Sequence, residues 1–190
     1  MKRQQWDRAA STFDEEPDHG LTDPHTLAAW RELLLGVLPS APARIADLGC
    51  GTGTLTRLLT DAGYSVDGVD YSPEMIRHAR VKVPEATFVI GDASEPPLEA
   101  ASYDVVLSRH VLWAMPDPTA AFARWDGLLR PNGVAVLIEG RWSTGAGLDA
   151  VTAQRIALGV HREATIRQLP ESVYWGKDID DERYLLVSRR

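Results

Sequence analysis

Cysteine is almost absent from this chain, which contains one cysteine, Cys50, among 190 residues. A single thiol excludes an internal disulfide framework and a zinc site that depends on several thiolates. The sequence also lacks an apolar run of roughly 18 to 20 residues, the length that a membrane-spanning helix requires. Its first residues, MKRQQWDRAASTFDEEPD, contain no apolar stretch of the kind found in signal peptides. We therefore expect a cytoplasmic protein that does not enter a membrane.

Clustered positive charge is also missing. The chain has 20 Lys and Arg against 27 Asp and Glu, a formal net charge of −7, and its basic residues are scattered apart from Arg189 and Arg190. Nucleic-acid binding depends on a basic surface, which this pattern does not provide. The Asp, Glu and His residues do not have the spacing of a metal site. We therefore expect a small-molecule ligand and neither a nucleic acid nor a metal.

What the chain does contain is an alternation of short apolar runs with helical stretches. The apolar runs have the length of buried parallel strands and cover residues 44–49, 65–70, 86–91, 103–109 and 133–139. Helical spacing of apolar residues, with Asp-Pro or Ser-Pro at three of the starts, predicts helices within residues 23–39, 54–62, 73–82 and 117–130.

Strands joined by helical crossovers predict an α/β fold, a doubly wound and mostly parallel seven-stranded sheet with helices on both faces. The tail, residues 172–190, departs from this alternation. An apolar run, an acidic turn near residues 178–181 and a second apolar run predict a C-terminal antiparallel hairpin at the sheet edge. One further helix is predicted near residues 148–159.

The stretch IADLGCGTGTLT, residues 45–56, places glycines at positions 49, 51 and 53, directly after the first strand. The first strand-to-helix turn of such sheets forms part of the ligand site, and glycines there let the backbone approach a ligand closely. A phosphate-binding P-loop would need Gly-Lys followed by Ser or Thr, which is missing from this stretch. A dinucleotide fingerprint would need its third glycine at position 54, which is a threonine.

Two acidic residues at strand ends narrow the choice of ligand. Asp47 comes two residues before the first glycine, where a carboxylate repels a pyrophosphate but attracts an ammonium or a sulfonium. Asp70 ends the second strand, the place where acidic side chains commonly bind two ribose hydroxyls. The residues therefore indicate a nucleoside with a positively charged arm.

Five segments stand in order between about residues 40 and 142: ADLGCGTGTLT, VDGVDYSPEMIRHAR, FVIGDA, YDVVLSRHVLWAMPDP and LLRPNGVAVLIEG. Together they resemble the class I, Rossmann-like S-adenosylmethionine-dependent methyltransferases, in particular the type-11 small-molecule methyltransferase domains. The resemblance implies S-adenosyl-L-methionine as cofactor and S-adenosyl-L-homocysteine as product. It also implies methyl transfer to an oxygen, nitrogen or carbon atom of a small-molecule acceptor.

The resemblance further implies which residues bind the cofactor. The methionine arm would lie near Asp47, Gly49, Gly51, Ser108 and Arg109, with Cys50 filling space in the same loop. The ribose would be held by Asp70, and the adenine would contact Tyr71, Met75, Asp92 and Ala93. Residues 1–22 resemble the lid segment of the family, with Trp6 or Phe13 closing over the cofactor. Residues 23–190 would then form a single S-adenosylmethionine-binding domain.

His110 is the candidate catalytic residue, because it ends the fourth predicted strand at the mouth of the expected site. Its imidazole could take a proton from a hydroxyl or an amine as the methyl group arrives. It could equally be a hydrogen-bonded residue that shapes the pocket, because methyl transfer from a sulfonium can proceed by positioning alone. Trp113 and Trp142 are expected as pocket walls or core residues, and His19, in the loop after the stretch WDRAASTFD, is a weaker catalytic candidate.

Two other functions remain open from the sequence. One is a nicotinamide-dependent oxidoreductase, against which the glycine spacing and Asp47 both argue. The other is a non-catalytic regulatory subunit that binds S-adenosylmethionine or S-adenosylhomocysteine. Residues 140–170 are short for the family, so the acceptor pocket could be open, adapted to a bulky acceptor, or completed by a second copy of the chain in a homodimer.

Overall fold

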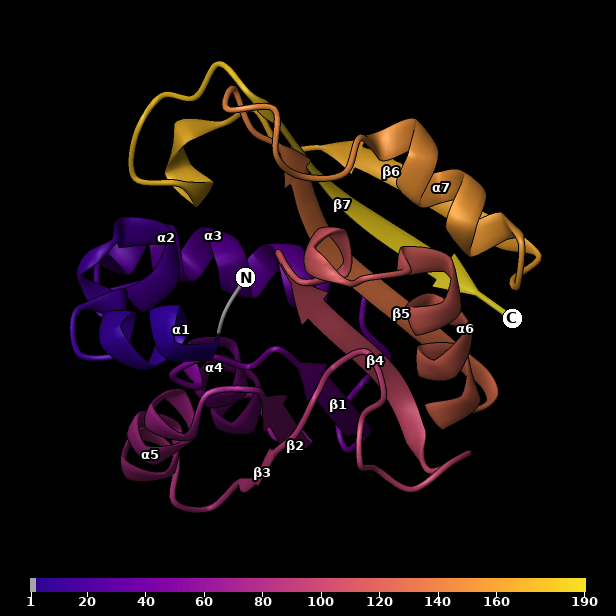
Figure 1. The fold of residues 1–190 in the computed structure, drawn as a ribbon, viewed down its shortest axis with the longest axis horizontal. Helices are drawn as coiled ribbons and strands as arrows, with labels where there is room; N and C mark the ends of the chain where they lie inside the picture. The colour runs from indigo at the N-terminus through magenta and orange to yellow at the C-terminus, as the bar shows by residue number, and fades with distance from the viewer. Residues whose placement is uncertain (1–2) are drawn as a thin grey trace.

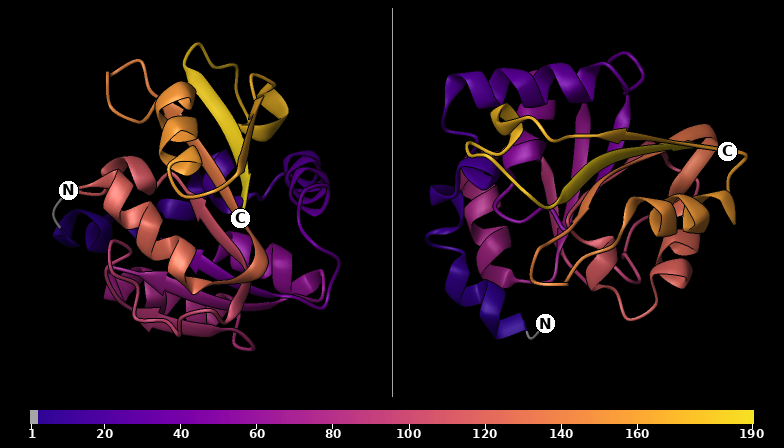
Figure 2. Two further views of the ribbon diagram at one scale, coloured as in Figure 1. Left: turned by 90° about the vertical axis from the view of Figure 1, so that its right-hand side faces the viewer. Right: turned by 90° about the horizontal axis from the view of Figure 1, so that it is seen from above.

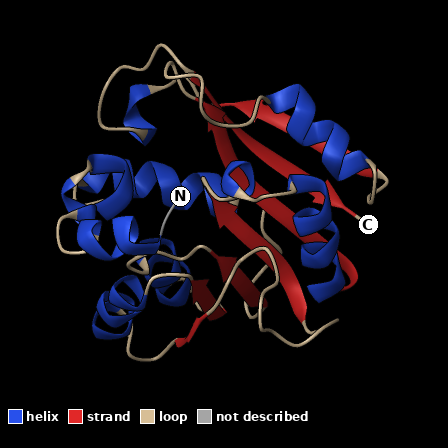
Figure 3. Ribbon diagram, viewed as in Figure 1, coloured by secondary structure: helices blue, strands red, loops and turns tan. Residues whose placement is uncertain are grey.

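The computed structural model describes residues 3–190, which form a seven-stranded sheet with helices on both faces (Figure 1; Figure 3). The strand order is β3-β2-β1-β4-β5-β7-β6. The strands are β1 (Arg44–Leu48), β2 (Ser65–Asp70), β3 (Thr87–Ile90), β4 (Tyr103–Arg109), β5 (Leu129–Arg141), β6 (Glu163–Gln168) and β7 (Glu182–Arg189).

The helices begin where the sequence places their caps. Side chains of Asp23, Ser72 and Asp117 each accept a hydrogen bond from a backbone N–H of the first helical turn, and Asp149 does the same. The α-helices are α1 (Arg3–Ala9), α2 (Pro17–Gly20), α3 (Pro24–Leu35), α4 (Thr54–Asp61), α5 (Pro73–Lys82), α6 (Pro118–Leu128) and α7 (Ala150–Leu158). The short 3-10 helices are η1 (Phe13–Glu15), η2 (Leu112–Ala114) and η3 (Ser172–Tyr174).

Successive side chains of each strand point to opposite faces of the sheet, and this divides the core into two layers. Ile45 of β1 belongs to the same core cluster as Leu34 of α3 and Leu59 of α4, while its neighbour Ala46 belongs to a second cluster with Trp125 of α6. Figure 2 shows α3 on one side of the sheet and α6 and α7 on the opposite side. The sheet is therefore buried on both faces, which accounts for the nearly continuous apolar runs of its strands.

The pairing confirms the predicted fold class. Strands β1 to β5 run parallel to one another, whereas β7 pairs antiparallel with both β5 and β6. The predicted helix near residues 148–159 is α7. Within residues 3–190, no helix is both long and apolar enough to cross a membrane.

The details of the C-terminal hairpin were predicted incorrectly. Its first strand is β6 rather than the apolar run that starts at residue 172, and β7 lies between β5 and β6 instead of extending an edge. Residues 172–174 form η3 because two aromatic residues after Glu171 turn into the core. The indole of Trp30 donates to the carbonyl of Tyr174 (2.7 Å), and the indole of Trp175 donates to the carbonyl of Leu169 (2.8 Å).

The carboxyl ends of the parallel strands meet at one edge of the sheet, the edge at which ligands bind in α/β folds of this kind. The N-terminal segment, residues 3–22, packs at this edge beside α5, as the indigo ribbon in Figure 1 shows. We call this segment the lid.

Candidate functional site

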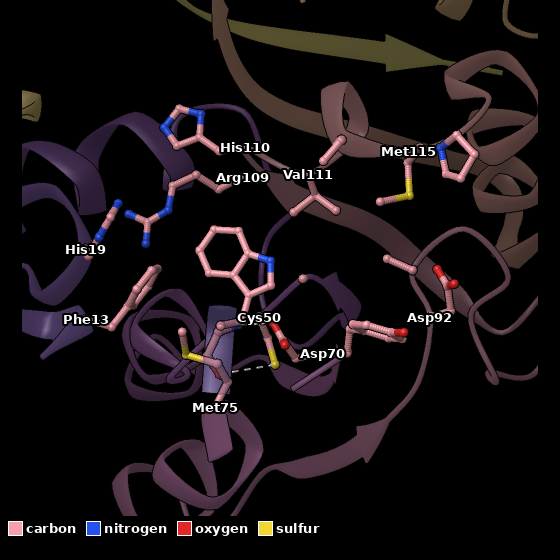
Figure 4. A pocket seen from close by; sticks show the side chains of 17 residues that line it. Phe13, His19, Cys50, Asp70, Met75, Asp92, Arg109, His110, Val111 and Met115 are labelled. Carbon is pink, nitrogen blue, oxygen red and sulfur yellow. Dashed lines mark hydrogen bonds between the residues drawn. The ribbon is translucent and has the colours of Figure 1, made fainter. Parts of the chain in front are cut away.

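A cavity of about 340 Å³ lies between the carboxyl edge of the sheet and the lid. Of the twelve residues expected to bind the cofactor, ten line it, and the other two are Asp47 and Ser108. Figure 4 shows Asp92 and Met115 at one end of the cavity and Phe13, His19, Arg109 and His110 at the opposite end. Cavities of this size hold ligands of nucleotide dimensions.

The glycine loop forms the floor between these two ends. Gly49 and Gly51 have φ angles of +74° and +55°, in the left-handed region that residues with a Cβ rarely adopt. A Cβ added to Gly49 would lie 2.3 Å from a methyl carbon of Val111, so a side chain does not fit there. Cys50 lies in the same loop. Burial raises the pKa of its thiol well above the usual value, so the thiol stays protonated and unreactive, as expected of a residue that only fills space.

Asp70 connects the glycine loop to the end of β2. One carboxylate oxygen accepts the backbone N–H of Gly51 (2.9 Å) and the other accepts that of Ser72 (2.8 Å). Burial raises the pKa of Asp70 despite these hydrogen bonds. Tyr71 and Met75 line the cavity beside it, the former half-exposed and the latter buried.

Asp92 and Ala93 follow β3 and complete this end of the cavity. The Asp92 carboxylate accepts the backbone N–H of Ser94 (2.8 Å), and the Ala93 carbonyl accepts the indole N–H of Trp125 (2.6 Å). These bonds hold the loop after β3 in a defined conformation. Ala93 is thereby anchored to α6 on the far face of the sheet.

Asp47 and Ser108 lie behind the cavity wall and are not among the residues that line it within residues 3–190. Both residues are inside strands, so their side chains point to a face of the sheet rather than past its edge. Asp47 is 2% exposed and accepts the hydroxyl of Thr56 on α4 (2.7 Å), and burial raises its pKa to about 6. The Ser108 hydroxyl is fully buried and has no hydrogen-bond partner within residues 3–190.

Arg109 ends β4 and reaches under the lid. Its guanidinium lies 5.3 Å from the ring centre of Trp30 and donates to the backbone carbonyl of Asp18. Figure 4 shows the guanidinium directed toward His19 and Phe13. Burial lowers the pKa of Arg109, but arginine keeps its charge in proteins.

His110 follows Arg109 in a left-handed conformation with φ of +59°. Its ring packs against Trp142 (5.2 Å between centres) and Trp175 (5.9 Å). Neither ring nitrogen has a hydrogen-bond partner in the described part of the chain. Burial lowers the pKa of His110 well below its usual value, so the imidazole is neutral at pH 7.

Trp113 and Trp142 form a layer behind His110. Their rings lie 5.2 Å apart, and the indole of Trp113 donates to the His110 carbonyl (2.9 Å). They support the cavity wall through His110 and are not among the cavity-lining residues of the described chain. They were expected as pocket walls or core residues; the structure shows them partly buried and packed behind His110.

The lid is closed over the cavity. Phe13 stacks on His19 with 4.2 Å between ring centres, and both line the cavity together with Trp6. The Asp14 carboxylate accepts hydrogen bonds from the Thr52 hydroxyl (2.5 Å) and the Lys82 ammonium (2.7 Å). We call the contacts among Asp14, Thr52 and Lys82 the lid latch.

Sequence reasoning missed Glu139, which supports the turn at His110. Its carboxylate accepts the backbone N–H groups of Val111 (3.0 Å) and Leu112 (2.7 Å) from the end of β5. The side chain is fully buried, and burial raises its pKa to about 8. An acid at the end of an otherwise apolar run, residues 133–139, was the available signal. Within residues 3–190, no three His, Cys, Asp or Glu side chains lie together as a metal site would require.

Comparison with known proteins agrees with this arrangement. Residues 46–137 match a family described as a methyltransferase domain. An uncharacterized methyltransferase of Mycobacterium tuberculosis is 39% identical over 108 residues, which are 57% of this chain and 43% of that protein. A trans-aconitate 2-methyltransferase of Methylobacterium radiotolerans is 34% identical over 145 residues, 65% of this chain and 55% of that protein. The chain thus spans about half the length of these relatives.

Among solved structures, a methyltransferase of Thermotoga maritima, described as a possible histamine N-methyltransferase, superimposes with a TM-score of 0.77. The match covers 99% of both chains at 15% identity, which shows a common fold. The fold is that of the class I methyltransferases. This fold and the methyltransferase domain matched by residues 46–137 both support a class I, S-adenosylmethionine-dependent methyltransferase, and they stand against the nicotinamide-dependent alternative.

Proposed function

We propose that the protein binds S-adenosylmethionine in the cavity and transfers its methyl group to a small-molecule acceptor. The observation that carries the proposal is the Asp70 carboxylate, which lines the cavity while holding the glycine loop through Gly51. A carboxylate in this position accepts ribose hydroxyls, and the loop beside it leaves the backbone open to a ligand. When bound, the cofactor would supply a methyl group on a positively charged sulfur.

The adenosine half fits the end of the cavity at β2 and β3. Asp70 would accept the ribose hydroxyls, and Asp92 would accept the exocyclic amine of the adenine. Tyr71, Met75 and Ala93 offer the apolar surfaces that a planar base requires. The acidic residues at this end also fit a nucleoside that lacks phosphate, because they would repel a pyrophosphate.

The amino-acid half of the cofactor fits the other end of the cavity, where the protein offers one positive and one negative side chain to the methionine arm. Arg109 lines the cavity and would pair with the methionine carboxylate. Asp47 lies behind the glycine loop, and its negative charge would attract the ammonium group from there. The same charge reaches the cavity-lining Arg109, where it stabilises the guanidinium. The cofactor's methionine arm carries this combination of charges. Phe13 would close over it, because the Phe13 ring lies against Gly51.

His110 is proposed to act on the acceptor. It lines the cavity past Arg109, on the side away from the adenosine end, and its neutral imidazole can accept a proton. The names of relatives leave the acceptor open, because one is named for trans-aconitate, an acid, and one for histamine, an amine.

Calorimetric titration tests the cofactor assignment. We expect micromolar binding of S-adenosylmethionine and S-adenosylhomocysteine and none of NAD. Replacing Asp70 by Ala should weaken binding by about 1 to 3 kcal/mol, because hydrogen bonds to a charged group are lost. The exposed Asp180 provides a control, Asp180→Ala, which should bind as the unmodified chain does.

Unchanged affinity in Asp70→Ala would refute the role of Asp70, and binding of NAD alone would refute the cofactor. Release of S-adenosylhomocysteine in the presence of an acceptor separates an enzyme from a regulatory subunit, which would bind the cofactor without turnover.

A further inference from the structure

Strand β6 forms one edge of the sheet, and its outer side pairs with no other strand in the described part of the chain. Residues of an antiparallel strand direct their backbone N–H and C=O groups alternately toward the neighbouring strand and away from it. The N–H of Leu169, just after β6, donates to the carbonyl of Arg183 on β7 (2.8 Å). Even-numbered residues of β6 therefore direct their backbone groups outward, which makes Ala164 and Ile166 the centre of an open edge.

The strand lacks most of the features by which proteins protect an edge. Its sequence, EATIRQ, contains no proline, glycine or lysine, and its pairing with β7 runs without a bulge. The carbonyl of Ala164 accepts the side-chain amide of Gln154 on α7 (2.8 Å), but a carbonyl oxygen can accept two hydrogen bonds. The backbone of β6 can therefore pair with one more strand.

Charged side chains do occur on β6, and their arrangement is complementary to itself. Glu163 and Arg167 are exposed and point to the same face of the sheet. In a second copy related by a two-fold axis at Thr165, the outward-facing Ala164 would pair with Ile166 of that copy. Glu163 would then lie directly opposite Arg167 of the second copy, on both sides of the axis. Opposite charges in such cross-strand positions stabilise the pairing.

The charges also select this axis over its neighbours. Because outward-facing residues must pair with outward-facing residues, the two neighbouring axes lie at Ala164 and at Ile166. Either of them would place one of the charged side chains opposite Thr165, and no ion pair would form. The axis at Thr165 forms two ion pairs.

Helix α7 lies against β6 (Figure 1), and exposed apolar side chains of this helix flank the same edge. Gln154 marks the side of α7 that faces the edge, because its side chain reaches Ala164. Val151 and Leu158 lie one helical turn before and after it on the same side, and they are 74% and 49% exposed. The axis at Thr165 would bring this side of α7 close to its counterpart and remove both side chains from water, which favours association.

We propose that β6 is a dimerisation surface and that its partner is a second copy of this chain. The two sheets would join through β6 into one continuous sheet, and α7 would pack against its counterpart across the axis. No residue of β6 or α7 is among the cavity-lining residues of the described chain. The contact would therefore leave both cavities unchanged, and the proposal does not depend on the proposed function.

Sedimentation velocity of the full chain tests this surface, and we expect a dimer at micromolar concentrations. Glu163→Arg and Arg167→Glu should each weaken the dimer at least about tenfold, because either change places like charges opposite each other on both sides of the axis. An equimolar mixture of the two variants should regain the dimer, since one copy then offers only positive charges and the other only negative ones. Glu171→Arg makes the same change of charge at an exposed position outside β6, and this control should remain dimeric.

Two further measurements test the contact on α7 and on the backbone. Val151→Asp should weaken the dimer, whereas Val81→Asp, at a position on α5 that is 77% exposed, should not. Hydrogen exchange at the amides of Ala164 and Ile166 should slow as the protein concentration rises, because these amides donate across the axis only in the dimer.

A wild type that stays monomeric up to about 100 μM would overturn the proposal, and this result does not depend on the folding of any variant. A dimer that Glu163→Arg leaves intact would also overturn it, because another surface would then hold the two copies together. Failure of the two variants to associate when mixed, with each of them folded by circular dichroism, would exclude the paired charges that define the axis.

Discussion

Glu139 shows how a single buried side chain can hold a site that it does not line. Its carboxylate fastens the backbone of Val111 and Leu112, and Val111 in turn packs over Gly49 so closely that a Cβ there would not fit. The left-handed His110 precedes this pair of hydrogen bonds directly. Glu139 therefore couples the end of β5 to the turn after β4.

The raised pKa of Glu139, about 8 against an ordinary 4.5, makes stability depend on pH. Between these values the folded chain keeps a proton that the unfolded chain releases, so the free energy of unfolding falls as pH rises. Glu139→Gln, a neutral isostere of the protonated acid, should abolish this decline. Relative to the variant, the wild type should lose on the order of 3 kcal/mol between pH 5 and 8. Urea unfolding at several pH values measures the difference, and parallel pH profiles would contradict the assignment.

The sequence predicts local conformation well where backbone geometry decides it. The glycine loop and Asp70 follow from local rules, because a strand-to-helix turn needs positive φ and a strand end presents its acid to the edge. Asp47 and Ser108 lie behind the cavity wall, and their expected contacts with the cofactor stay predictions. Glu139 was missed because its partners, Val111 and Leu112, lie nearly thirty residues earlier in the chain.

At the scale of elements, the lid is fastened to two of the site's loops. The latch joins Asp14 to Thr52 of the glycine loop and to Lys82 at the end of α5, and Asp7 accepts the hydroxyl of Ser72 (2.6 Å) after Asp70. We therefore expect these bonds to open when a ligand is exchanged.

Asp14→Asn removes the charge of the latch while keeping its shape. The Asp14 and Lys82 side chains are partly exposed, at 38% and 26%, which reduces the contribution of their ion pair. We expect S-adenosylhomocysteine to dissociate about three- to tenfold faster, since a partly exposed charged hydrogen bond contributes about 1 kcal/mol. Stopped-flow Trp fluorescence, to which Trp6 of the lid contributes, measures the rate. The neighbouring exposed Glu15, changed to Gln, serves as control, and equal rates in both variants would argue against the latch.

At the scale of the whole molecule, a buried polar cluster ties the C-terminal strands to the second core layer. Nε2 of His161 lies 2.8 Å from an Asp126 oxygen on α6, and Nδ1 lies 2.8 Å from the Ser188 hydroxyl on β7. Arg190 donates to both oxygens of Asp126. Although burial alone would raise the pKa of Asp126, Arg190 and His161 lower it. The cluster fixes β7 between its neighbours.

His161→Leu should destabilise the fold by about 2 kcal/mol, because it leaves a largely buried carboxylate with fewer partners. The side chains of His161 and Asp126 are 0% and 12% exposed, so solvent does not replace the lost contact. A lower urea midpoint with an unchanged slope is the expected result. His25→Leu, at an exposed position, should leave the midpoint in place. A midpoint shift of equal size in both variants would refute a specific role for the cluster.

Local patterns were enough to predict strands β1 to β5, the caps of α3, α5 and α6, and the glycine turn, because each depends on residues adjacent in the chain. Contacts between distant residues required the folded chain. Asp14 meets Lys82 across 68 residues, and Trp30 meets Tyr174 across 144. Such contacts form only when packing of the whole core offsets the entropy of closing long loops. They turn residues 172–175 inward, close the lid and gather three nitrogen-bearing side chains at one end of the cavity.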